Sequence, residues 1–246
     1  MTYSAVHDLL IDERELRVYS NGTGTPMLML HDLGSSAATF EHLTTPLVRA
    51  GRELVAVDLP GCGRSDPVPG GEELDSYVDH LALMFPSLGS DPIDLLGHGF
   101  GGYLAATLAA RHPEVVHRLI LCEPTTPPRT GPSASARMSP SMALSGAVTT
   151  LRRGKLRQNL HGFSRAKSIL DQLAKADPQW WDSLANITAP TMVLGSSSAE
   201  VGERAILNLV AAGIPGAERV TMVGPRKPHT SAPVEFTAQI VQFLAR

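Results

Sequence analysis

The sharpest chemical signal in the chain is a glycine-rich turn between an apolar segment and an alanine-rich segment. Residues 95–103 have the sequence LLGHGFGGY, which predicts the end of a strand, a tight turn and the start of a helix. Such a turn could hold a phosphate, but its spacing matches neither G-x-G-x-x-G nor the P-loop with its lysine. Gly99, at the centre of the turn, has no side chain that could attack a substrate.

The elements that position this turn follow a regular alternation of short β-rich runs and helical patterns. Residues 27–30 and 119–121 are continuously apolar, as expected for strands buried on both faces of a sheet. The alternation predicts an α/β fold with a mostly parallel, doubly wound sheet. Strands are expected at residues 15–20, 27–31, 53–57, 92–96, 117–122, 191–195 and 218–223. Helices are expected at residues 38–50, 74–88, 100–112, 201–212 and 233–245.

The alternation stops after Glu123. Residues 124–138 are rich in proline, serine and threonine and predict a loop. Two helical patterns follow, at about 139–163 and 164–184. Helices inserted between consecutive strands are expected to cover the carboxyl edge of the sheet, where open α/β sheets bind ligands. We therefore divide the chain into a core of residues 1–123 and 185–246 and a small helical lid of residues 124–184.

Composition and charge restrict the class of partner. The formal net charge is −3, and no block of Lys and Arg indicates nucleic-acid binding. No apolar stretch is long enough for a membrane helix and no signal peptide is evident, so a soluble, cytoplasmic protein without membrane contact is expected. The only cysteines, Cys62 and Cys122, are too far apart to indicate a disulfide scaffold or a zinc site. We expect a small-molecule ligand, no metal and no cofactor.

Three further segments carry recognisable motifs. HDLGSS at residues 31–36 follows an apolar strand, DLPGCGRSD occupies residues 58–66, and NITAPTMVLG occupies residues 186–195. Together with the glycine-rich turn, they resemble the oxyanion loop, the D-x-P-G-x-G-x-S turn and the late strand of the α/β-hydrolase family. The resemblance covers nearly the whole chain outside the lid. It implies the α/β-hydrolase fold, with Gly99 at the position of the serine in the G-x-S-x-G nucleophile elbow.

The same resemblance implies two further catalytic positions, and both hold unsuitable side chains. Ser198 stands at the position of the family's acid, and Arg226, seven residues before Pro233, stands at the position of its histidine. Serine cannot orient an imidazolium as a carboxylate does, and arginine does not accept a proton at neutral pH. Hydrolysis by the family mechanism is therefore not expected. Because the turn depends on backbone geometry, the substitution Gly99→Ser is expected to fold normally.

The resemblance leaves the family's oxyanion hole in place. This hole consists of two backbone N–H groups, here those of Leu33 and Phe100. Each well-aimed donor stabilises a developing oxyanion or enolate by roughly 3–4 kcal/mol. Asp32 replaces the usual glycine beside the hole, and it either points outward or acts as a new acid–base group.

Three histidines have both a structural and a functional interpretation. His98 flanks Gly99, and His31 begins the oxyanion loop, so each could contact a substrate or belong to the framework of its turn. His229 matches a second, non-catalytic histidine of the late loop, and it would enter the pocket if that loop were shifted.

Other candidate residues lie at the end of a strand, in the late loop and in the lid. Glu123 could supply the missing acid, and Glu200 is the carboxylate nearest to the usual acid position. Arg226 could anchor a carboxylate or phosphate. Trp180 and Trp181 could wall an apolar substrate pocket or pack the lid against the core.

Three functional hypotheses follow. The first is a cofactor-free, non-hydrolytic enzyme, such as a cyclase, isomerase or lyase, that uses the oxyanion hole on a small apolar carbonyl compound such as a polyketide-like intermediate. The second is an inactive ligand-binding or regulatory protein. The third is an esterase, lactonase or acyltransferase whose serine has been replaced by glycine, which requires a hydrogen-bonded base and acid beside Gly99.

Overall fold

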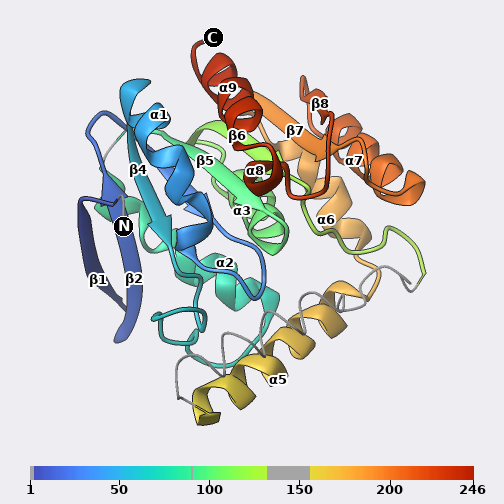
Figure 1. Cartoon of the computed structure of the whole chain (residues 1–246). Coiled ribbons are helices and arrows are strands. Elements are labelled where there is room, and N and C mark those ends of the chain that lie inside the picture. Colours follow the sequence, from blue (N-terminus) through green and yellow to red (C-terminus); the bar gives the residue numbers. More distant parts are fainter. Residues whose placement is uncertain (1–2, 90, 132–155) are drawn as a thin grey trace.

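An eight-stranded sheet forms the centre of the molecule (Figure 1). The computed structural model describes residues 3–89, 91–131 and 156–246, with the side chains of residues 156–163 left out. The strand order is β1-β2-β4-β3-β5-β6-β7-β8, with β1, β2 and β4 paired antiparallel and the pairs from β4 to β8 parallel. The strands are β1 (Ala5–Ile11), β2 (Arg14–Asn21), β3 (Thr25–Leu30), β4 (Arg52–Val57), β5 (Ile93–His98), β6 (Val116–Cys122), β7 (Thr191–Ser196) and β8 (Glu218–Met222).

Helices cover both faces of the sheet. The α-helices are α1 (Thr44–Arg49), α2 (Leu74–Ala82), α3 (Phe100–Arg111), α5 (Leu156–Leu173), α6 (Pro178–Ser183), α7 (Val201–Gly213), α8 (Pro228–Ser231) and α9 (Pro233–Leu244). Short 3-10 helices are η1 (Ala37–Leu43), η2 (Phe85–Leu88) and η3 (Leu184–Asn186). None of the helices in the described ranges combines the length and the apolar character that crossing a bilayer requires.

The alternation of side chains along the buried strands creates two hydrophobic layers. On β3, Leu28 and Leu30 belong to the layer under α2, α3 and α7, whereas Met27 and Met29 belong to the layer under η1, α1 and α9. All four side chains are fully buried. Continuous apolar runs in the sequence therefore correspond to strands buried on both faces, as predicted.

The expected α/β fold is confirmed, and the differences are local. β1 was not predicted, because six of its seven residues are exposed or half-buried and leave no clear hydrophobic alternation. The lid segment expected as one helix over 164–184 is divided between α5 and α6. Pro178 interrupts the expected helix, because proline has no N–H to donate in a helix interior. Asp177 is the N-cap of α6, and its side chain accepts a hydrogen bond from the Trp180 N–H at 2.9 Å. Most of the helix expected at 139–163 lies outside the described residues.

Candidate active site

The turn between β5 and α3 is as tight as its glycines predict. A Cβ on Gly97 would lie 2.2 Å from the carbonyl oxygen of Gly101, and a Cβ on Gly101 would lie 2.1 Å from that of Leu30. Gly99 adopts φ 56° and ψ −119°, in the region that favours glycine. The structure therefore contains the elbow expected from the sequence, with Gly99 directly before the first residue of α3.

The side chain of Asp32 turns inward and binds the two N–H groups expected to form the oxyanion hole. Oδ1 of Asp32 accepts hydrogen bonds from Leu33 N at 2.8 Å and from Phe100 N at 2.9 Å. The outward orientation considered for Asp32 is therefore wrong. The two donors do converge on one oxygen atom, but that oxygen belongs to the protein, so the expectation of an open oxyanion hole is also wrong for this state.

The Asp32 carboxyl group also fills the space of a side chain at position 99. A Cβ on Gly99 would lie 2.1 Å from Oδ1 and 2.2 Å from Cγ of Asp32, distances that real Cβ contacts do not reach. Gly99→Ser was expected to fold normally; in the structure its added atoms would have to displace the Asp32 carboxyl group, so we now expect a cost in stability. Aspartate at position 32 and glycine at position 99 are sterically coupled.

Burial and local charges determine the acid–base character of Asp32. Burial raises the pKa of this carboxyl group, while hydrogen bonds from Phe100 and Leu33 and the positive charge of Lys227 act in the opposite direction. Oδ2 has no hydrogen-bond partner among the residues that the structure describes. Asp32 thus combines one fixed oxygen with one that is free to exchange a proton.

The acid position inferred from the sequence is not built for catalysis. Ser198 is exposed, and its backbone N–H donates to Oγ of Ser196 at 2.9 Å. Glu200 caps α7 in a reciprocal capping box with Glu203. Glu123 accepts hydrogen bonds from the N–H of Ser196 at 3.2 Å and of Lys227 at 3.1 Å. Its carboxylate therefore holds the end of β7 and the late loop together.

The residue at the position inferred for the catalytic histidine is not placed for acid–base chemistry. Arg226 is exposed and pairs with Glu203 of α7 at 2.8 Å. The next residue, Lys227, has a left-handed backbone with φ 56° and directly precedes α8. Its charge influences Asp32, His98 and His229 through space. Lys227 was not singled out in the sequence, because the motif match pointed to its neighbour.

His31 is held as part of the framework. Its Nδ1 lies 2.7 Å from the carbonyl oxygen of Asp32, and its Nε2 accepts the N–H of Leu59 at 2.9 Å. These contacts assign the neutral tautomer with the proton on Nδ1, and burial lowers the pKa of His31 in agreement. His31 thereby links the oxyanion loop to the turn after β4.

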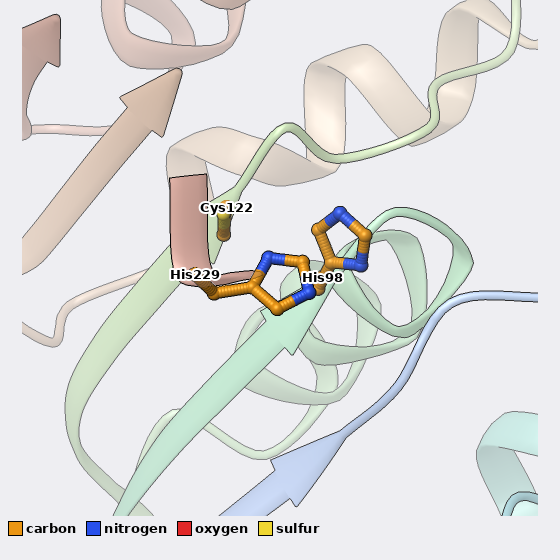
Figure 2. A group of neighbouring side chains, drawn as sticks. All are labelled: His98, Cys122 and His229. Carbon is orange, nitrogen blue, oxygen red and sulfur yellow. The ribbon is translucent and has the colours of Figure 1, made fainter. Parts of the chain in front are cut away.

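His98 and His229 lie together beneath the elbow, and Cys122 completes the group (Figure 2). The ring centroids of His98 and His229 are 4.0 Å apart. The His229 ring also packs against Phe40 and Phe236. Burial lowers the pKa of His98 to about 3 and that of His229 to about 2, so both rings are neutral at physiological pH. Neither histidine forms a hydrogen bond with a carboxylate in the described part of the chain.

Trp180 and Trp181, on α6, pack against α3 and the segment after β6. They are 4% and 8% exposed, and their indole N–H groups donate to Thr107 Oγ1 at 3.0 Å and to the Pro127 carbonyl at 2.9 Å. Trp180 also stacks on Tyr103 of α3 with centroids 5.5 Å apart. These contacts give both tryptophans a packing role, which was one of the two interpretations left open.

The comparison with known proteins agrees with the fold. The sequence profile of the alpha/beta hydrolase family matches residues 27–241 of the chain. The chain belongs to this family. A likeness in structure shows the same fold: an enol-lactonase from Burkholderia xenovorans LB400 superposes with a TM-score of 0.75 over 98% of this chain and 100% of that one, at 20% identity.

Several curated relatives of this α/β-hydrolase family member are named as hydrolases. A 2-hydroxy-6-oxononadienedioate/2-hydroxy-6-oxononatrienedioate hydrolase of Cupriavidus pinatubonensis is 30% identical over 244 residues, covering 84% of this chain and 82% of that protein. A 2-hydroxymuconate semialdehyde hydrolase of Pseudomonas sp. (strain CF600) is 35% identical over 107 residues, covering 42% of this chain and 38% of that protein. Several matches to curated proteins span less than half of that protein's own length.

Proposed function

We propose that this α/β-hydrolase family member is an acid–base enzyme that acts on a small apolar carbonyl compound without forming an acyl-enzyme. One observation carries the proposal: the Asp32 carboxyl group occupies the space of a side chain at position 99 and accepts both N–H groups of the oxyanion pair. In this fold, ligands bind at the carboxyl edge of the sheet, where this carboxyl group lies. The reaction class is proton transfer, as in an isomerase, cyclase or lyase.

The environment of Asp32 suits proton transfer. Its raised pKa brings the carboxyl group toward the range in which it can both accept and donate protons. In the proposed step, Oδ2 takes a proton from a carbon next to the substrate carbonyl, and the C–H electron pair forms an enolate. Returning the proton to a different carbon completes an isomerisation. The Lys227 ammonium group offsets the negative charge of the enolate.

The names of the relatives support a carbonyl substrate. The name of the Cupriavidus pinatubonensis relative contains an oxo group. The name of the Pseudomonas relative contains a semialdehyde. Both compounds can form enols, which is the property that a carboxylate base requires in its substrate. The proposal keeps this chemical class and replaces the serine-dependent step with proton transfer.

A hydrolase that has lost its serine is the second candidate, and the names of the relatives favour it. It requires a base and an acid poised beside Gly99. In the structure, His229 is close to Thr39, and Glu123 accepts two backbone N–H groups, so these residues form no such pair. This arrangement favours proton transfer over a disabled triad.

Hydrogen exchange in D₂O tests the proposal directly. A panel of enolisable ketones, β-diketones and aldehydes is incubated with the protein, and loss of the α-proton signal is followed by NMR. Exchange above the buffer rate is expected, and Asp32→Asn should lower it by about 10²–10⁴-fold. Asp79→Asn, an exposed substitution on α2, is the matched control and should leave the rate unchanged.

Two results would contradict the proposal. One is exchange that is equally fast with Asp32→Asn, and the other is binding of panel compounds without any exchange, which would indicate a ligand-binding protein. The same panel is extended to activated esters. A burst of product from the unaltered chain would instead indicate a covalent hydrolase.

A further inference from the structure

His98, Cys122 and His229 bring three metal-binding atoms together, and their positions follow from the fold. His98 ends β5 and Cys122 ends β6, and the two residues are direct partners in the parallel register. His229 reaches them from α8, as Figure 2 shows with its ring between the other two side chains. One ligand atom from each residue lies within 4.8 Å of the others.

The chemistry of this group suits a borderline or soft cation. Two imidazole nitrogens and one cysteine sulfur are ligands that Zn²⁺ and Cu⁺ prefer. Around a tetrahedral zinc ion, ligand atoms are about 3.5 Å apart, as follows from bond lengths of about 2.0–2.3 Å. Small side-chain rotations of the three residues would therefore enclose an ion and leave a fourth position for a water molecule or a ligand.

A second observation points to a ligand. His229 is only 1% exposed, so its Nδ1 is shielded from water. This atom has no hydrogen-bond partner in the described part of the chain. The other ring nitrogen, Nε2, lies 3.3 Å from Thr39 Oγ1. If Nε2 carries the proton and donates it to the hydroxyl, Nδ1 presents its lone pair to the cluster. Metal-binding histidines are commonly oriented by such a hydrogen bond from the opposite nitrogen.

We propose that His98, Cys122 and His229 form a binding site for a borderline transition-metal ion, for which Zn²⁺ is the probe, at the carboxyl ends of β5 and β6. Binding replaces the S–H bond of Cys122 with an S–metal bond, and the proton leaves to solvent. The two imidazoles bind through lone pairs and release no proton. This site is separate from the proton-transfer role of Asp32 and does not depend on it.

The expectation of no metal site rested on sequence spacing. The two cysteines are remote from each other, and His98, Cys122 and His229 are spread over more than half of the chain. Only the register of β5 with β6 and the position of α8 bring the three together.

Cobalt spectroscopy provides the test. The protein is freed of metals with a chelator and titrated with Co²⁺, which has visible ligand-field bands and a near-ultraviolet charge-transfer band when a thiolate binds. We expect both, saturating at one equivalent, and displacement of the bands by Zn²⁺. Zinc at about 100 times its dissociation constant should raise the melting temperature by roughly 5–10 °C.

Two cysteine variants make a matched pair. Cys122→Ser should abolish the charge-transfer band, whereas Cys62→Ser, at the other free cysteine, should retain it. Thr39→Val should weaken Co²⁺ binding by about 10-fold or more, because it removes the partner of His229 Nε2. If Cys122→Ser fails to fold, His229→Gln serves in its place. It should weaken Co²⁺ binding at least as strongly as Thr39→Val does.

The proposal is overturned by any of three results. These are the absence of cobalt bands at saturating metal, a charge-transfer band that persists in Cys122→Ser, and binding that is unchanged in His229→Gln. A band that disappears only in Cys62→Ser would place the metal at another site and would equally exclude this one.

Discussion

The Asp32 carboxyl group occupies the space that a side chain at position 99 would need. This restricts the chemistry that we propose for the site. The carboxyl group takes both oxyanion N–H bonds and leaves no room for a Cβ at position 99. A buried carboxylate without partners would be costly, and the two N–H groups provide the compensation. The aspartate at position 32 and the glycine at position 99 therefore depend on each other sterically.

Serine at position 99 should destabilise the folded protein unless Asp32 is removed as well. Gly99→Ser alone is expected to lower the free energy of unfolding by about 1–3 kcal/mol, since the added atoms overlap the carboxyl group. Asp32→Gly combined with Gly99→Ser should recover most of this loss. Urea unfolding of both single variants and the double variant measures the coupling. Additive effects would contradict the steric account.

Asp32 should also make stability depend on pH. Because its pKa is raised in the folded protein, the folded state holds the proton more tightly than the unfolded state does. Its contribution is complete below the unfolded pKa of about 4 and is lost as pH rises through the higher folded value. The free energy of unfolding of the unaltered chain, minus that of Asp32→Asn, should therefore fall as pH rises. A difference that rises with pH would show that the hydrogen bonds outweigh burial.

Motif positions in the sequence located the site but not the orientation of its side chains. The elbow and both N–H donors lie where the motifs placed them. The inward rotation of Asp32 could not be predicted, because it depends on the space that glycine at position 99 leaves open in three dimensions. Likewise, counting back from Pro233 indicated Arg226, whereas the charge that acts on Asp32 belongs to the next residue in the chain, Lys227.

At the scale of elements, α5 is attached to the core by polar contacts as well as by apolar ones. Arg165 donates to the carbonyl of Gly61 at 2.8 Å and lies 3.3 Å from the carboxylate of Glu72. Gln172 donates to the Glu72 carbonyl at 2.7 Å and accepts the N–H of Leu74 at 3.2 Å. The helix is thereby fixed to the turn after β4 and to the start of α2.

Removing the arginine should loosen this helix before the rest of the molecule. Arg165→Met is expected to cost about 1–2 kcal/mol, because it removes a charge-assisted hydrogen bond while keeping much of the side-chain volume. Hydrogen exchange should increase in α5 while β5 and β6 stay protected. Lys167→Met, at an exposed ion pair on the same helix, is the control and should change little. Equal exchange in both variants would argue against this attachment.

The elements differed in how readily their sequences predicted them. Buried strands and the amphipathic helices α7 and α9 were predictable, since their apolar residues repeat with a clear period, whereas α5 crosses the boundary expected between residues 163 and 164. β1 escaped notice because it is an exposed edge strand, and the boundary between α5 and α6 was set by Pro178 and the Asp177 cap instead of by hydrophobicity.

At the scale of the whole molecule, a buried ion pair joins the sheet to the C-terminal helix at the edge opposite the elbow. Asp94, at the start of β5, is fully buried, and its Oδ2 lies 2.6 Å from Nε of Arg52. The same guanidinium group donates to the carbonyl of Leu244 at 2.9 Å. His117 approaches Oδ1 of Asp94 at 3.2 Å. β4, β5 and β6 thus meet at the Asp94 carboxylate, and α9 is joined to them through the Arg52 guanidinium group.

Breaking this pair should affect global stability and not the site alone. Asp94→Asn is expected to lower the free energy of unfolding by about 3–5 kcal/mol, because the Arg52 charge loses its buried partner. That is a large part of the about 5–15 kcal/mol typical of a folded domain. Asp79→Asn, at an exposed pair with Arg111, should cost about 1 kcal/mol or less. Thermal unfolding followed by circular dichroism compares the two, and similar losses would refute the prediction.

The contact between Asp32 and Gly99 also makes the effect of each substitution depend on the other position. Gly99→Ser made first places its Cβ against the carboxyl group, whereas Asp32→Gly made first clears that space. The cost of serine at position 99 therefore depends on the order in which the two positions change, which is epistasis between them.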